Sequence, residues 1–222
     1  MELLFKEIKQ IITPEFIAES SRRFAMDETK LTNLSDSIVA GTLAGLLANG
    51  DNSASEEILI SFVSRFNDIE EIKISPIEDQ IDSKTIDAVI AWENKAFMGK
   101  RLEFVSLLAQ TSGVGEVYVD KLMLSISYVA ALYLGRKLMT KEYTTTGLLG
   151  QMHAERNFYL GYVPFGLTSL LGLPSLLALG QNLTSDAKVV SDTVYYEIMH
   201  ANTPVQENKN SWRKWFFSKA AL

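Results

Sequence analysis

The feature that most constrains the fold is an almost uninterrupted apolar stretch over residues 122–135 (LMLSISYVAALYLG), in which Ser125 and Ser127 are the only strongly polar side chains. A helix that is apolar on nearly every side has to be buried on all sides. As a helix, residues 122–135 would be about 21 Å long at 1.5 Å per residue. A membrane span needs roughly 20 apolar residues, so this stretch is too short to cross a membrane. The sequence therefore predicts an all-α fold, a multi-helix bundle around one fully buried central helix.

Apolar residues at helical spacing, together with cap residues, predict further helices along the rest of the chain. Pro14 suits the first turn of a helix, Asp27 can cap the next one, and Gly113 ends a later one. Thr144 offers a cap further along. The expected helices cover residues 2–12, 14–25, 28–49, 56–66, 84–98, 100–112, 116–140, 148–160 and 187–201, with a short one after Ser75-Pro76.

Charge is distributed unevenly along the chain. Residues 51–93 hold eleven acidic side chains against three basic ones, a balance of −8, whereas residues 204–222 hold four basic side chains against one acidic one, a balance of +3. Because an acidic surface repels nucleic acid, no nucleic-acid partner is expected. We predict N-terminal helices that pack on the bundle (1–66), an acidic linker with a short helix (67–83), the main bundle (84–202) and a basic aromatic tail (203–222).

Small residues form one face of the helix expected over residues 28–49. They are Ala40, Gly41, Ala44, Gly45 and Ala48. A face of this kind lets another backbone approach closely, but the Gly-x-x-x-Gly pair is meaningful mainly in membrane helices. Two interpretations stay open, packing of helices within the domain and a contact between subunits.

Several classes of chemistry are excluded by what the sequence lacks. It has no cysteine, so disulfides, thiolate metal sites and cysteine nucleophiles are excluded. It also has no G-x-S-x-G elbow, P-loop or G-x-G-x-x-G fingerprint. Charged residues at positions 2, 6, 7 and 9 interrupt what would be the apolar core of a signal peptide, so a cytoplasmic location is expected. We predict no catalytic residue, no cofactor, no metal ion and no enzymatic activity.

His153, Glu155 and Arg156 lie together in the sequence, and the other histidine, His200, is far from them. His153 would serve as a base or a metal ligand, yet a metal site needs three or four ligands and only one histidine occurs here. A histidine at the surface or at an interface is the simpler interpretation. The alternative function is a small-molecule-binding domain or an unrecognised enzyme, with a pocket lined by His153, Arg156, Tyr159 and Tyr162.

A long uncharged run follows Arg156 and ends at Asp186. Its length alone would permit a membrane span. However, helix breakers recur in it at short intervals, which favours broken helices packed inside a protein. These breakers are Gly161, Pro164, Gly166, Gly172, Pro174 and Gly180.

The C-terminal tail combines aromatic and basic side chains, namely Trp212, Arg213, Lys214, Trp215, Phe216, Phe217 and Lys219. This combination favours the headgroup region of a membrane. The same side chains would equally suit docking on the domain or on a neighbouring protein. The tail is therefore a candidate contact with a membrane surface or a membrane-protein partner.

Four stretches together resemble a known family. They are AQTSGVG (109–115), LGRKLM (134–139), TTTGLLGQM (144–152) and VPFGLTSLLG (163–172). Over about residues 31–173 the chain resembles the bacterial YidB-like family, also called domain of unknown function 937. The resemblance implies an all-helical bundle and supplies no accepted activity and no catalytic residues. It also implies that such a domain can precede a transmembrane segment and an OmpA-like domain. The acidic segment around residues 70–87 is an insert relative to simpler members of that family.

From these features we expect a non-enzymatic helical scaffold or interaction module. Its apolar helix faces predict a homo-oligomer. Its tail predicts membrane association at the inner face of the inner membrane.

Overall fold

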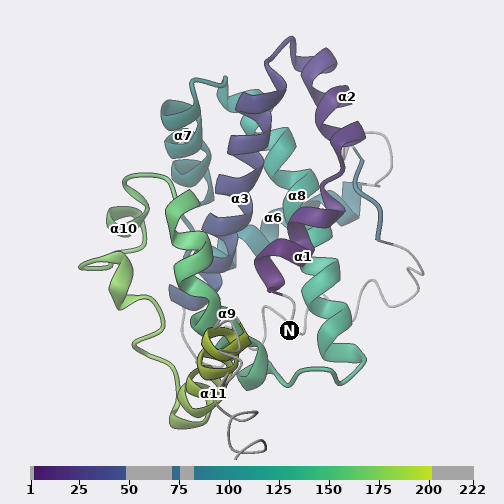
Figure 1. The fold of residues 1–222 in the computed structure, drawn as a ribbon. Helices are drawn as coiled ribbons and strands as arrows, with labels where there is room; N and C mark the ends of the chain where they lie inside the picture. Colours follow the sequence, from purple (N-terminus) through teal and green to yellow (C-terminus); the bar gives the residue numbers. More distant parts are fainter. Residues whose placement is uncertain (1–2, 49–71, 76–82, 202–222) are drawn as a thin grey trace, which may run out of the picture.

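Helices make up all the regular secondary structure that the computed structural model describes, which comprises residues 3–48, 72–75 and 83–201 (Figure 1). The predicted all-α fold is thereby confirmed. The α-helices are α1 (Leu4–Ile11), α2 (Pro14–Phe24), α3 (Glu28–Ala48), α6 (Ser83–Ala96), α7 (Arg101–Ser112), α8 (Glu116–Met139), α9 (Thr145–Tyr159), α10 (Leu167–Leu170) and α11 (Ser185–Ala201), and the 3-10 helices are η1 (Leu160–Tyr162) and η2 (Leu176–Ala178). The helices predicted at 56–66 and after Ser75-Pro76 fall largely outside the described residues.

Cap residues that the sequence singles out set the ends of several helices. The Asp27 side chain accepts a hydrogen bond from the backbone N–H of Lys30 at 3.0 Å, at the start of α3. Thr144 accepts one from the N–H of Gly147 at 3.0 Å, at the start of α9. Gly113 ends α7 with φ 65°, a left-handed conformation that glycine adopts without a steric cost. Local sequence thus determines where these helices begin and end.

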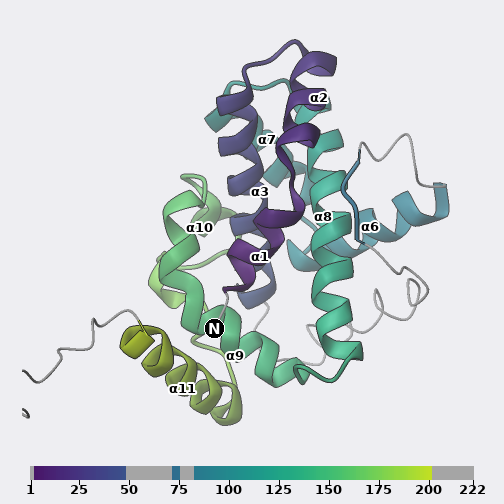
Figure 2. The same ribbon diagram turned by 45° about the vertical axis from the view of Figure 1, so that its right-hand side comes forward.

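The helix that most other elements contact is α3, and it lies in the middle of the fold (Figures 1 and 2). α1, α2, α6, α7, α8, α9 and η1 all pack against it. The prediction of one fully buried central helix over residues 122–135, which lie in α8, is not confirmed. Tyr128 and Tyr133 in that stretch are only half-buried. A tyrosine has an apolar ring and a polar end, so partial burial suits it.

α3 and α8 are each long and apolar enough to cross a membrane when length and composition alone are considered. However, 78% of the most apolar window of α3 and 67% of that of α8 are buried inside the fold. The core helices of a water-soluble protein pass the same test, so this finding is weak evidence for a membrane span.

The uncharged run folds into short pieces rather than one helix. η1, α10 and η2 lie in it, with turns at Gly166 (φ 101°) and Gly172 (φ 68°) between them. η1 packs against α3 and α10 packs against α7. The expected broken helices are therefore present, and they line one side of α3 and α7.

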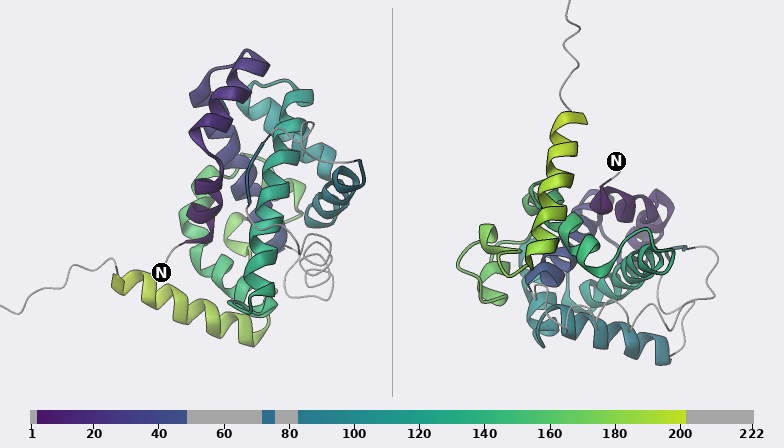
Figure 3. Two further views of the ribbon diagram at one scale, coloured as in Figure 1. Left: turned by 90° about the vertical axis from the view of Figure 1, so that its right-hand side faces the viewer. Right: turned by 90° about the horizontal axis from the view of Figure 1, so that it is seen from below.

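α11 lies across α9 at the end of the fold (Figure 3). Ala187, Val194 and Ile198 form its buried face. Gly150 of α9 permits this close packing, because a Cβ atom there would lie 2.7 Å from the carbonyl oxygen of Ala187. The opposite face of α11 is exposed and carries apolar side chains, including Val189.

Candidate functional site

The small-residue face of α3 is covered by other helices of the same chain. A Cβ atom added to Gly41 would overlap the Phe104 ring of α7, and one added to Gly45 would lie 2.9 Å from the carbonyl oxygen of Ala96 in α6. Ala40 and Ala44 are fully buried. The fifth member, Ala48, is half-buried against the core. This face is filled by intradomain packing, which leaves no room there for a second subunit.

His153 lies half-buried between α9 and α11. Its Nδ1 lies 2.8 Å from the hydroxyl oxygen of Ser191, and its Nε2 contacts the guanidinium group of Arg156. A Cβ atom at Gly180 would overlap the imidazole ring. Burial, followed by the charge of Arg156, lowers the pKa of His153 to about 4. His153 is therefore a neutral residue at a helix interface, with both ring nitrogens engaged.

The four side chains of the predicted pocket do not gather around one space. Tyr159 is fully buried, and its hydroxyl donates to the carbonyl oxygen of Met152 at 3.0 Å. Tyr162 of η1 lies beside the same Phe5 ring as Tyr159, with centroid distances of 5.2 Å and 6.0 Å from Phe5. Because Tyr159 has no exposed surface, it cannot line a site together with the exposed Tyr162. Among the described residues, no group of three His, Asp or Glu side chains is arranged to hold a metal ion.

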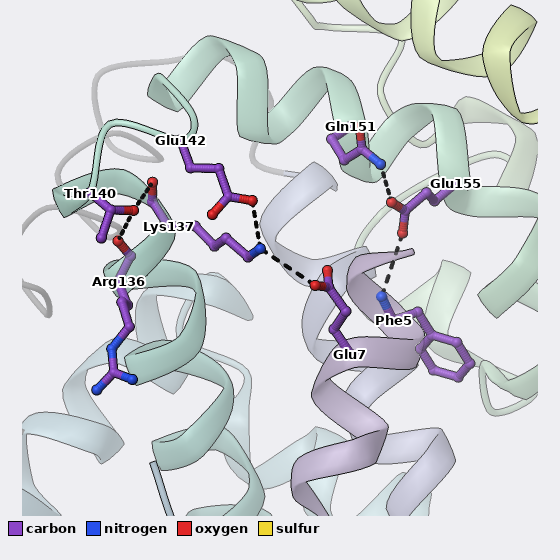
Figure 4. Close-up of polar contacts among 8 residues, drawn as sticks. All are labelled: Phe5, Glu7, Arg136, Lys137, Thr140, Glu142, Gln151 and Glu155. Carbon is purple, nitrogen blue, oxygen red and sulfur yellow. Dashed lines mark hydrogen bonds and ion pairs between the residues drawn. The ribbon is translucent and has the colours of Figure 1, made fainter. Parts of the chain in front are cut away.

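A buried carboxylate caps the N-terminus of α1, and the sequence analysis did not predict this contact. Glu155 of α9 is fully buried and accepts hydrogen bonds from the backbone N–H of Phe5, at 3.4 Å, and from the amide of Gln151 (Figure 4). The first N–H groups of a helix lack partners within the helix and carry partial positive charge. Glu155 thus performs, from a residue 150 positions away, the function of an N-cap.

A chain of ion pairs continues from α1 to the end of α8. Lys137 lies 3.4 Å from the carboxylate of Glu7 and 2.6 Å from that of Glu142 (Figure 4). The same ammonium group lies 5.3 Å from the ring centroid of Tyr133. These contacts join α1, α8 and the segment before α9, so this polar cluster has a structural role.

Replacing Glu155 with glutamine should reduce the dependence of stability on pH. Burial raises the pKa of Glu155 to about 7, although hydrogen bonds from Gln151 and from the backbone oppose the shift. The folded protein then binds a proton more tightly than the unfolded chain, so this group's stabilisation is present at low pH and is lost as pH rises through about 7. Between pH 5 and pH 8, the wild type should lose on the order of 2–3 kcal/mol more than Glu155→Gln. Urea unfolding at both pH values measures this.

Glu197→Gln is the matched control, because Glu197 is exposed on α11. It should follow the pH dependence of the wild type. Equal pH dependence of the unfolding free energy in Glu155→Gln and the wild type would contradict a raised pKa of Glu155 in the folded protein.

A second buried ion cluster joins α6, α7 and α8. The Arg101 guanidinium contacts both Glu93 and Asp120. Glu93 is fully buried and Arg101 nearly so, whereas Asp120 is partly exposed. Burial raises the pKa of Glu93 to about 7, while Arg101 acts in the opposite direction. The sequence analysis counted Glu93 among the acidic residues of 51–93 and did not predict this ion pair. Its spacing from Val89, however, places Glu93 on the apolar face of α6.

Besides a groove of about 680 Å³ between α1, α8 and residues 72–74, two grooves in the described part of the chain are candidate binding sites. The first, which we call the polar groove, lies between α3, α7 and η1 and has a volume of about 480 Å³. It brings together Thr111 and Ser112 from the first of the four quoted stretches with Tyr162, Val163 and Pro164 at the start of the uncharged run. Three separate segments form it, so its shape was not readable from the sequence.

The second groove, which we call the apolar groove, lies between α7 and α10 and has a volume of about 400 Å³. Leu102, Leu107 and Leu170 contribute its apolar lining, and Glu103, Ser106 and Gln110 of α7 contribute polar side chains. The ammonium group of Lys100 donates to the carbonyl oxygen of Leu170 at 2.7 Å, which holds α10 beside α7. Phe165 precedes this groove's Gly166 and is 94% exposed. Phe165 and the exposed Leu102 are therefore candidates for an interaction surface.

The predicted contact residues of the tail, Trp212 to Lys219, lie outside the described residues. Comparison with protein-family models, curated proteins and solved structures finds no match to this chain. The resemblance to the YidB-like family therefore stays a prediction. A function has to be argued from the surfaces described above.

Proposed function

We propose that this protein is a non-enzymatic helical interaction module that associates with a second copy of itself through the apolar groove and Phe165. The observation that carries the proposal is the exposure of Phe165 next to Gly166, which lines a groove with apolar side chains from Leu102, Leu107 and Leu170. Leu102 at the edge of this groove is also 68% exposed. Burying one such side chain contributes about 1.5–3 kcal/mol, so both would gain from a covering partner.

A second copy suits this surface because a protruding ring and a groove lie side by side on it. In a two-fold dimer the same patch contacts itself, so each Phe165 can enter the groove of the other copy. Phe165 and α10 lie in the segment between Arg156 and Asp186, which has no charged residue, whereas the α7 side of the groove carries Glu103. Depletion of charge is typical of the central part of an interface.

Three observations support a role without catalysis. Glu93 contacts Arg101, Glu155 accepts from the backbone of α1, and His153 lies against Ser191. Each of these buried groups therefore has a structural partner from another element. A catalytic group instead faces a site that substrate can reach.

The proposal extends to location on the basis of the sequence alone. Aromatic and basic residues of 203–222 would hold the module at the inner face of the inner membrane, with the helical domain in the cytoplasm. The proposed self-association surface lies on α7 and α10, which are separate from this tail in the sequence. Self-association and membrane attachment can therefore be tested independently.

Phe165→Ser should weaken self-association at least tenfold, because the variant lacks the apolar ring that enters the groove of the other copy in the proposed dimer. Sedimentation equilibrium over a range of concentrations measures the dissociation constant. Val189→Ser serves as the matched control, since Val189 is 65% exposed but lies on α11. The control should associate like the wild type. Equal association of Phe165→Ser and the wild type would exclude this surface.

A further inference from the structure

α11 lies at one edge of the molecule and carries apolar side chains on its outer side. Among the described elements, α9 is the one with which it makes extensive contact (Figure 3). The side away from α9 holds four exposed apolar side chains, Val189, Tyr195, Tyr196 and Met199. Val189 and Tyr196 are each 65% exposed, and residues seven positions apart lie on the same face of a helix. We call this side of α11 the outer face.

The outer face is also acidic. α11 has three exposed acidic side chains against one exposed basic one, a balance of −2; these are Asp186, Asp192, Glu197 and Lys188. Asp192 follows Val189 by three positions and precedes Tyr196 by four, so it shares their face. Within the described residues, neither Asp192 nor Glu197 forms an ion pair. A segment that covers the outer face should therefore combine apolar and basic side chains.

The C-terminal tail of the same chain has this composition. Residues 204–222 have a charge balance of +3 and four aromatic side chains, Trp212, Trp215, Phe216 and Phe217. A positive segment complements a negative surface and is guided to it.

The tail is also long enough to return along α11. Residues 202–211 join the end of α11 to Trp212, and an extended chain of ten residues spans up to about 33–36 Å. With 17 residues, α11 is about 25 Å long. Trp212 can therefore reach every position on the outer face. A linker of this length holds the tail at an effective concentration that is roughly millimolar, so even a weak contact is populated.

We propose that the tail folds back and covers the outer face of its own α11. The aromatic rings of residues 212–217 lie on Val189 and Tyr196, and basic side chains of the tail lie beside Asp192. Covering apolar side chains removes them from water, which is favourable in proportion to the area covered. Ion pairs at an exposed site contribute little, so the rings supply most of the affinity. This contact requires neither self-association nor a membrane.

Disulfide cross-linking of the full chain tests the proposal, because the sequence has no cysteine of its own. Thr193→Cys places a thiol on the exposed side of α11, and Ser211→Cys places one next to Trp212. Under mild oxidation at low protein concentration, we expect a disulfide within one chain, identified by mass spectrometry after proteolysis. Absence of this disulfide overturns the proposal. A disulfide that instead joins two chains shows that the tail covers another copy, and it also overturns the proposal.

Serine variants show whether the aromatic and apolar side chains, rather than the covalent linker alone, bring the two thiols together. Trp212→Ser with Trp215→Ser should slow the disulfide at least about tenfold, and so should Val189→Ser with Tyr196→Ser. Val117→Ser is the matched control, because Val117 is 66% exposed but lies on α8, and it should not change the rate. Circular dichroism confirms that each variant is folded. An unchanged rate in either double variant overturns the proposal.

Liposomes of phosphatidylcholine and phosphatidylserine separate this inference from the membrane attachment proposed above. Only the effect of lipid rests on that proposed function, since a tail docked on α11 withholds its rings from a membrane. If both proposals hold, the liposomes compete for the rings and slow the disulfide. A fast disulfide that liposomes leave unchanged supports docking and contradicts membrane attachment. Flotation of the full chain with liposomes, without any disulfide in their absence, overturns docking.

Discussion

Replacing Arg101 with methionine should lower the free energy of unfolding by about 3–5 kcal/mol at pH 8. Arg101 is buried with Glu93, whose side chain is fully buried. Removing the guanidinium group leaves a carboxylate inside the fold without its partner, and an uncompensated buried charge is strongly destabilising. Methionine has a similar length and is apolar, so the loss reports the charge rather than a cavity. Urea unfolding of the variant and the wild type at pH 8 measures the difference.

Two comparisons distinguish this explanation from a general loss of packing. Glu93→Gln combined with Arg101→Met should recover much of the stability, because the unpaired charge is then absent. Asp120→Asn should cost less than about 1 kcal/mol, since Asp120 is 40% exposed and water screens its charge. A loss below about 1 kcal/mol in Arg101→Met would contradict the structural role of this ion cluster.

Gly41→Ala should destabilise the protein by about 1–3 kcal/mol, although alanine favours a helix more than glycine does. The added Cβ atom overlaps the Phe104 ring, which is fully buried and has no space into which it can move freely. Either the ring or the two helices must shift, and overpacking a well-packed core carries this cost. Denaturant unfolding measures the change, which should not depend on protein concentration.

Gly161→Ala is the matched control, because a Cβ atom at Gly161 meets nothing within 4 Å. Its stability should stay within about 0.5 kcal/mol of the wild type. Adding Phe104→Leu to Gly41→Ala should restore part of the lost stability, since the smaller side chain leaves room for the methyl group. If Gly41→Ala instead dissociated an oligomer without affecting the folded monomer, this face would be a subunit contact.

The order and ends of the helices were largely predictable because they depend on local sequence. Apolar spacing marked α3, α7, α8 and α11, while Asp27, Thr144 and Gly113 act within one turn of their own positions. Hydrogen bonds across three or four residues need no information about the rest of the chain. The breaks in the uncharged run followed from its glycines and prolines in the same way.

The partners of the buried polar groups were not predictable from the sequence. Glu155 lies 150 residues from Phe5 in the chain, and Glu93 meets Arg101 across the connection at residues 97–100 between α6 and α7. The spacing of Glu93 from Val89 could have placed it on the apolar face of α6, but the sequence names a partner for neither glutamate. The two grooves are also products of tertiary packing, since each combines elements that are far apart along the chain.

The most direct test of the proposed interaction module is its mass in solution. Light scattering coupled to size exclusion should be applied to the full chain and to a version ending at Asn202, with and without anionic liposomes. The account predicts a discrete oligomer for both versions without lipid, because the self-association surface lies on α7 and α10. A full chain that stays monomeric at every concentration, and that binds liposomes only when residues 203–222 are present, would contradict self-association and leave the tail as the main contact.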